Sequence, residues 1–129
     1  MSNFDLVVIG SGPGGYVAAI RGAQKGLKTA IIEDWEIGGT CLNRGCIPTK
    51  SMIHSANLYK EAVNGEMFGL LTGQLGFDFE VINKRKIEVV LKLRTGVERL
   101  LKANKIEIIR GRGAIKNPQT VIIKTTNGK

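Results

Sequence analysis

Six consecutive residues near the N-terminus, GSGPGG at positions 10–15, restrict the possible folds of this chain more than any other segment. They follow an apolar run at 4–10, which is typical of a strand in the middle of a parallel sheet covered on both faces. Small and apolar residues at helical spacing then occupy 16–25, and a second apolar run occupies 28–33. We therefore expect a βαβ unit over residues 4–33, with a right-handed crossover between parallel strands.

The glycines of this segment fit the pattern G-x-G-x-x-G, in which each glycine has a physical task. Gly10 allows a sharp turn, Gly12 lets backbone N–H groups approach a pyrophosphate, and Gly15 permits close packing of helix and strand. The helix N-terminus adds partial positive charge, and Pro13 fits there because its missing N–H has no helical partner. We therefore expect a nucleotide phosphate at Gly10, Gly12, Pro13, Gly14 and Gly15; a tight turn without a ligand is the alternative.

An acidic residue, Glu33, ends the second apolar run 18 residues after Gly15. A carboxylate there accepts hydrogen bonds from ribose hydroxyls and repels a 2′-phosphate, which favours FAD or NAD over NADP. A surface glutamate without a ligand is the alternative.

The only cysteines, Cys41 and Cys46, are five positions apart. Closely spaced cysteines in a cytoplasmic chain are more often redox-active or metal-binding than structural, and with only His54 nearby as a further ligand we expect no metal. Residues five apart in a regular helix are too distant for a bridge, but Gly45 and Pro48 would distort the helix enough to allow one. We expect an easily reduced disulfide at a helix N-terminus; two buried, inert thiols are the alternative.

The remaining elements are read from apolar spacing and from glycine and proline. We expect an interrupted helix at 40–62, a surface loop or short turns at 64–76, a long basic helix at 79–104, and strands at 105–110 and 120–125. The last two are separated by turns marked by Gly111, Gly113 and Asn117-Pro118. Asn127-Gly128 is a strong hairpin signal followed by one residue only, so we expect the sheet to continue beyond this chain.

The chain carries a net charge of +8, and 14 of its 19 basic residues follow residue 50. Such an excess is compatible with nucleic-acid binding. However, Ile87, Val90, Leu91, Val97 and Leu101 recur at helical spacing, which favours an amphipathic helix with a solvated basic face. With 43% apolar residues, no membrane-spanning run and no secretory signal, we expect a cytoplasmic globular domain without nucleic-acid or membrane partners.

The cysteines lie within GGTCLNRGCIPTK at positions 38–50. Together with the glycine pattern and Glu33, this segment resembles the N-terminal FAD-binding segment of flavoprotein disulfide reductases. The IPTK end is nearer to the dihydrolipoamide dehydrogenases than to other members, although mercuric and glutathione reductases share nearly the same motif. The resemblance implies an α/β fold: a Rossmann-like FAD-binding domain with a parallel sheet and crossover helices, incomplete at the C-terminus, with the NAD and interface domains absent from residues 1–129.

The resemblance also implies roles for individual residues. Cys41 would be the thiol that exchanges with substrate, Cys46 the thiolate against the flavin, and Lys50 a positive charge near the reduced ring. The ribose and pyrophosphate would contact Glu33, Gly39 and Thr40, and the adenine would contact Gly113. Arg44 stands where many members have a small apolar residue, which would alter the charge near the disulfide.

The implied reaction passes electrons from dihydrolipoamide through the Cys41–Cys46 disulfide and FAD to NAD. The implied partners are dihydrolipoamide on a carrier domain of a 2-oxoacid dehydrogenase or glycine cleavage complex, and a second subunit in a homodimer. His54 does not match the family's acid-base motif, so residues 1–129 alone are expected to be inactive. A non-catalytic FAD-binding module is the main alternative.

Overall fold

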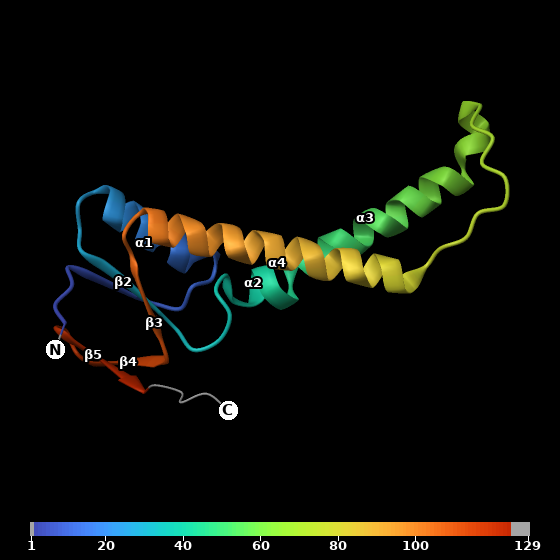
Figure 1. Cartoon of the computed structure of the whole chain (residues 1–129). Helices are drawn as coiled ribbons and strands as arrows, with labels where there is room; N and C mark the ends of the chain where they lie inside the picture. Colours follow the sequence, from blue (N-terminus) through green and yellow to red (C-terminus); the bar gives the residue numbers. More distant parts are fainter. Residues whose placement is uncertain (1, 125–129) are drawn as a thin grey trace.

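The computed structural model describes residues 2–124 and contains four α-helices, one 3₁₀ helix and five strands within that range (Figure 1). In chain order these are β1 (Leu6–Ile9), α1 (Pro13–Gln24), β2 (Thr29–Glu33), α2 (Gly39–Arg44), α3 (Cys46–Val63), the 3₁₀ helix η1 (Gly65–Phe68), α4 (Phe79–Ala103), β3 (Glu107–Arg110), β4 (Arg112–Asn117) and β5 (Thr120–Lys124).

The first three strands form a parallel sheet in the order β1-β2-β3. All five residues of β2 are buried, because this strand is paired on both edges and covered on both faces. The predicted βαβ unit and parallel pairing are confirmed. The prediction of β1 as the middle strand is wrong for the described residues, since apolar composition indicates burial but does not determine the order of strands.

The segment predicted to contain only turns around Gly111 and Gly113 is instead a strand, β4, which pairs antiparallel with β5. Five of its six residues are exposed, so the sequence has no strong apolar signal there, and its pairing partner comes later in the chain. The predicted turn at Asn117-Pro118 closes this hairpin. Thr125 and the Asn127-Gly128 turn lie outside the described residues.

The core lies between the sheet and the helices α1, α2 and α4. Its buried apolar members are Ala19, Ile31, Ile37, Leu42, Val90, Val97, Leu101 and Ile106. The C-terminal part of α4 crosses the sheet region beside α1, whereas its N-terminal part runs with α3 as a long helical hairpin that projects away from the sheet (Figure 1).

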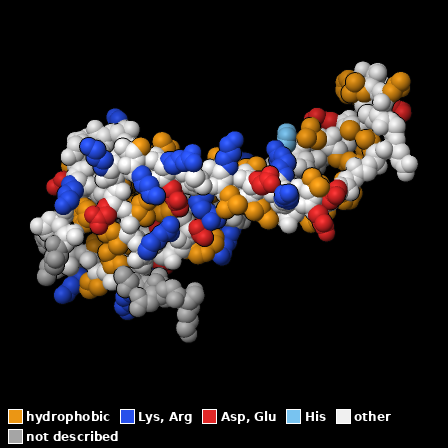
Figure 2. All heavy atoms as spheres, in the orientation of Figure 1, with side chains coloured by type: hydrophobic (Ala, Val, Ile, Leu, Met, Phe, Trp, Pro, Cys, Tyr) orange, Lys and Arg blue, Asp and Glu red, His pale blue; other side chains and the backbone are white. Residues whose placement is uncertain are grey.

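Helix α4 agrees with the predicted basic helix in extent and in character. Asp78 is its N-cap and accepts a hydrogen bond from the amide of Val81 at 3.1 Å. Val90, Val97 and Leu101 are buried, while the predicted core positions Ile87 and Leu91 are about half exposed, at 46% and 48%. Basic and acidic side chains are intermingled along this part of the molecule (Figure 2). No helix within residues 2–124 is long and apolar enough to cross a membrane.

Candidate functional site

The glycine segment forms a tight turn from β1 into α1. Gly10 has φ +92°, a left-handed conformation that side chains rarely adopt. A Cβ atom at Gly15 would overlap the carbonyl oxygen of Gly10, so the close approach of helix and strand requires glycine there. At Gly12 and Gly14, by contrast, a Cβ would meet no atom within 4 Å. Protein packing therefore explains Gly15, whereas the space beside Gly12 and Gly14 is open and fits a bound nucleotide phosphate.

The first turn of α1 has the donors that such a phosphate needs. Pro13 is the first helical residue, and Gly12 is the N-cap without a side-chain hydrogen bond. The first N–H groups of a helix have no helical acceptor, and the helix dipole favours an anion there. The N-terminus of this twelve-residue helix thus presents the backbone N–H groups of its first turn at the open face of the glycine turn.

Glu33 is buried at the end of β2 and holds the glycine turn in place. Its Oε2 accepts hydrogen bonds from the Ser11 amide at 2.9 Å and the Ser11 hydroxyl at 2.6 Å, and its Oε1 accepts one from the Trp35 amide at 3.0 Å. Burial by itself raises the pKa of Glu33, but these hydrogen bonds outweigh it and hold the pKa below the ordinary value. A carboxylate has about four acceptor sites, so the ionised group can still accept a further hydrogen bond from a ribose hydroxyl.

A cavity of about 180 Å³ lies at the carboxyl ends of β1 and β2. Its lining brings together three of the residues selected from sequence, Gly10, Glu33 and Gly113. It also includes Ile9, Ile32, Asp34, Gly111 and Arg112, which the sequence analysis did not select. Gly113 comes into range because β4 packs on β2, where a Cβ at Gly113 would lie 3.2 Å from the side chain of Ile32.

Ser11 is a residue of this site that the sequence analysis did not select. Its side chain is fully buried, donates to Glu33 and accepts a hydrogen bond from the Gly38 amide at 3.1 Å. The only signal in the sequence was a hydroxyl at a variable position of the glycine pattern. Its partners lie 22 and 27 residues away, so that hydroxyl could not be assigned a partner.

The segment containing the cysteines begins directly beside the glycine turn. Gly39, the first residue of α2, has φ +63°, and a Cβ on it would lie 2.7 Å from the Cα of Gly12. Thr40 follows and is exposed. The sequence-predicted pyrophosphate residues from the two segments, Gly12 and Gly39, are therefore adjacent in space.

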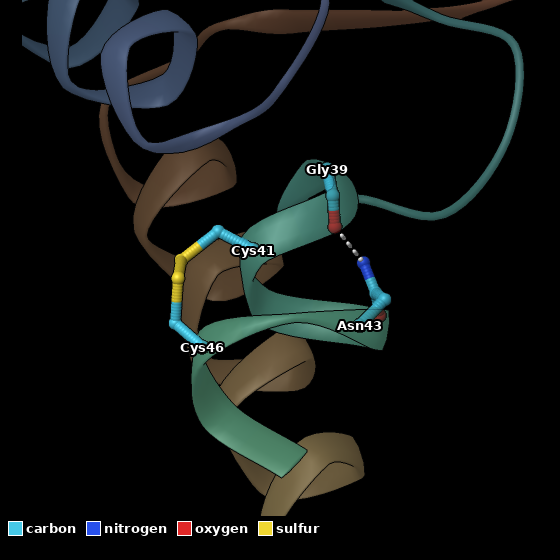
Figure 3. The surroundings of a disulfide bond; sticks show 4 residues. All are labelled: Gly39, Cys41, Asn43 and Cys46. Carbon is cyan, nitrogen blue, oxygen red and sulfur yellow. Dashed lines mark hydrogen bonds between the residues drawn. A yellow bond between two sulfur atoms is a disulfide. The ribbon is translucent and has the colours of Figure 1, made fainter. Parts of the chain in front are cut away.

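Cys41 and Cys46 form a disulfide with their Cα atoms 4.8 Å apart (Figure 3). The predicted bridge and the predicted break in the helix are both confirmed. The break lies at Gly45, which ends α2 and precedes α3. Pro48 lies in the first turn of α3, where its missing N–H has no helical acceptor. The break separates it from Arg44, whose carbonyl it would meet in a continuous helix, so the contribution of Pro48 to the break stays a prediction.

Cys46 is the first residue of α3, and Lys50 follows one helical turn later on the same face. Both are exposed, so a positive charge and the helix N-terminus lie close to a sulfur that solvent can reach. The guanidinium of Arg44 lies 3.6 Å from the ring centre of Trp35, and this stacking engages the charge that was predicted to act on the disulfide. Within residues 2–124, no group of three or more His, Cys, Asp or Glu side chains could hold a metal ion.

The family model for pyridine nucleotide-disulphide oxidoreductases matches residues 4–128. This chain belongs to that family. The chain is 49% identical to a dihydrolipoyl dehydrogenase of Zymomonas mobilis over 127 residues, which covers 98% of this chain and 27% of that protein. It is 43% identical to the dihydrolipoyl dehydrogenase of Bacillus subtilis, covering 99% of this chain and 28% of that protein.

A solved structure of the HOCl-induced flavoprotein disulfide reductase RclA from Escherichia coli, as its Cu(II) complex, has a TM-score of 0.79 and 30% identity. The match covers 99% of this chain and 26% of that one. The resemblance to flavoprotein disulfide reductases and the Rossmann-like fold class are thereby confirmed. The chain spans about a quarter of the length of the curated relatives it matches.

Proposed function

We propose that this chain is the FAD-binding, disulfide-carrying part of a dihydrolipoamide dehydrogenase. The observation that carries the proposal is the contact between Gly39 and Gly12, because it joins the segment of the redox disulfide to the open glycine turn. FAD would be held by the first turn of α1, by Glu33 at the ribose, and by Gly39, Thr40 and Gly113.

The chemistry of the chain's own residues is thiol–disulfide exchange. One thiolate of dihydrolipoamide attacks the sulfur of Cys41, which forms a mixed disulfide and releases Cys46 as a thiolate. The second substrate thiol then displaces Cys41, so lipoamide leaves as a disulfide and both cysteines are reduced. The N-terminus of α3 and the charge of Lys50 stabilise the thiolate of Cys46. When bound, FAD would accept the two electrons of the cysteine pair and pass them to NAD.

The partners and location of the complete protein are part of the same proposal. The substrate dithiol would be carried by a domain of a 2-oxoacid dehydrogenase or glycine cleavage complex, and the protein would act as a homodimer in the cytoplasm. Other family members act on different disulfides, so a mercuric or glutathione reductase and a non-catalytic FAD-binding module remain the rival functions.

The test is anaerobic reduction of the FAD-loaded chain by a thiol, and the loss of flavin absorbance measures its rate. We expect dihydrolipoamide to reduce the flavin faster than glutathione does, and Cys41→Ser and Cys46→Ser to abolish this reduction while FAD stays bound. Equal rates with glutathione would contradict the substrate assignment. Absence of a flavin spectrum after loading would contradict the whole proposal.

A further inference from the structure

The side chain of Asn43 forms hydrogen bonds with the segment that precedes Cys41. Asn43 lies between the two cysteines in sequence, and its amide points away from the disulfide (Figure 3). Its Nδ2 donates to the carbonyl oxygens of Gly39 at 2.9 Å and Ile37 at 3.0 Å, with a longer contact to Glu36 at 3.4 Å. One amide group therefore ties together the turn before α2 and the first residue of α2.

Arg94 of α4 holds this segment from outside. Its Nε donates to Oδ1 of Asn43 at 2.9 Å, and its Nη1 lies 2.8 Å from Oε2 of Glu36. The side chain of Arg94 is only 22% exposed, so the ion pair is partly shielded from water. A planar guanidinium can bond both partners at once, which a lysine cannot do with the same geometry. Arg94 thus fastens residues 36–46 to a helix 51 positions away in sequence.

The segment depends on tertiary contacts to stay ordered, and those of Asn43 and Arg94 add to the burial of Ile37 and Leu42. Helix α2 has six residues and no side-chain N-cap, and a helix of that length is marginal without tertiary contacts. Gly38 precedes this helix and Gly39 begins it, both at positive φ, and Gly45 follows it. Glycine loses more conformational entropy on ordering than any other residue, so contacts that fix this stretch are needed to offset that loss.

We propose that Arg94 and Asn43 are positioning residues for the redox disulfide, which they hold in the conformation that lets Cys41 and Cys46 bond. The inference rests on the proposed function, in which this bond is broken and reformed. Reduction adds two electrons and two protons to the pair, supplied by a dithiol that itself becomes a disulfide, and frees the two sulfurs to separate. The contacts of Arg94 and Asn43 oppose that separation and keep each thiol at a high effective concentration near the other. They therefore favour the oxidised form and lower the reduction potential of the pair.

The experiment measures that potential directly, without FAD or turnover. The chain is equilibrated with mixtures of reduced and oxidised dithiothreitol, the free thiols are trapped by alkylation, and the fraction reduced is measured by mass spectrometry. In Arg94→Met and Asn43→Ala we expect the equilibrium constant for disulfide formation to fall about tenfold, which equals a rise of about 30 mV for a two-electron couple. The double variant should fall little further than the larger single change, because both residues act in one network.

Arg85→Met is the matched control. Arg85 also lies on α4 and donates to a residue of α3, the hydroxyl of Ser51 at 3.1 Å, but it makes no hydrogen bond to residues 36–46. We expect this variant to lose a comparable interhelical contact and to keep the original potential. Arg94→Lys keeps the positive charge but lacks the planar guanidinium that bonds both partners, so the potential should shift by an intermediate amount.

An unchanged potential in folded Arg94→Met, or an equal shift in Arg85→Met, would overturn the inference. Circular dichroism of each oxidised variant shows whether it is folded, and if Asn43→Ala is not, Arg94→Met and Arg94→Lys decide the question. Failure of the proposed function has a different signature: dihydrolipoamide would not reduce the original chain, while the shifts in dithiothreitol would persist.

Discussion

At the scale of single residues, Glu33 is the group on which nucleotide binding is expected to depend most. Glu33→Gln keeps the size of the side chain and removes its charge, so it weakens the hydrogen bonds proposed with the ribose. A hydrogen bond to a charged group is worth about 1.5–3 kcal/mol, and we expect FAD affinity to fall by about ten- to a hundredfold. Equilibrium dialysis of FAD measures this. Glu107→Gln, at an exposed position on β3, is the control and should bind as before; equal affinity in Glu33→Gln would contradict the assignment.

The hydroxyl of Ser11 should make the stability of the ligand-free chain depend on pH. Because Ser11 helps to hold the pKa of Glu33 below its ordinary value of 4.5, the ionised carboxylate stabilises the fold above that pH. This stabilisation is lost as the pH falls through the lowered pKa of the folded state. In Ser11→Ala the pKa moves back toward its ordinary value, so the free energy of unfolding should fall near neutral pH and approach that of the original chain in acid.

Urea unfolding at neutral pH and in steps below pH 4.5 measures the difference for Ser11→Ala. Ser51→Ala removes another buried hydroxyl, one that accepts from Arg85 and does not contact Glu33, and serves as the control. A loss of stability in Ser11→Ala that is the same at every pH would show that the hydroxyl acts by packing alone.

At the scale of elements, the break between α2 and α3 distinguishes the effects of Gly45 and Pro48. Pro48 lies in the first turn of α3, so Pro48→Ala should leave the break and the disulfide in place. We expect a loss of only about 0.4–1 kcal/mol, which arises from the greater freedom of the unfolded chain. Thermal unfolding of the oxidised chain and the count of free thiols measure these two outcomes. If a continuous helix formed and the thiols became free, Pro48 would be responsible for the break after all.

At the scale of the whole molecule, residues 1–129 contain one glycine fingerprint and span about a quarter of their dihydrolipoyl dehydrogenase relatives. A polypeptide of these residues, loaded with FAD, should not form NADH from dihydrolipoamide at the rate of a complete enzyme. It has a disulfide to accept electrons but no second fingerprint for NAD, and a missing acid-base group typically costs ~10² to 10⁴ in rate. Spectrophotometric assay of NADH formation tests this, with the Bacillus subtilis enzyme as the reference. Comparable turnover would refute it.

Local sequence determined the glycine turn, the βαβ unit, the extent of α4 and the disulfide, because each depends on contacts within a few residues or on a short repeating pattern. Gly10 and Gly15 were predictable from the turn that they must make, and Cys41 and Cys46 from their spacing. Tertiary structure alone decided what depends on distant partners. β4 is a strand because β5 pairs with it, Ser11 belongs to the site because it hydrogen-bonds Glu33 and Gly38, and Arg94 reaches Asn43 across 51 positions. Such contacts form only when packing has paid the entropy of bringing remote segments together, and no local pattern records which segments those are.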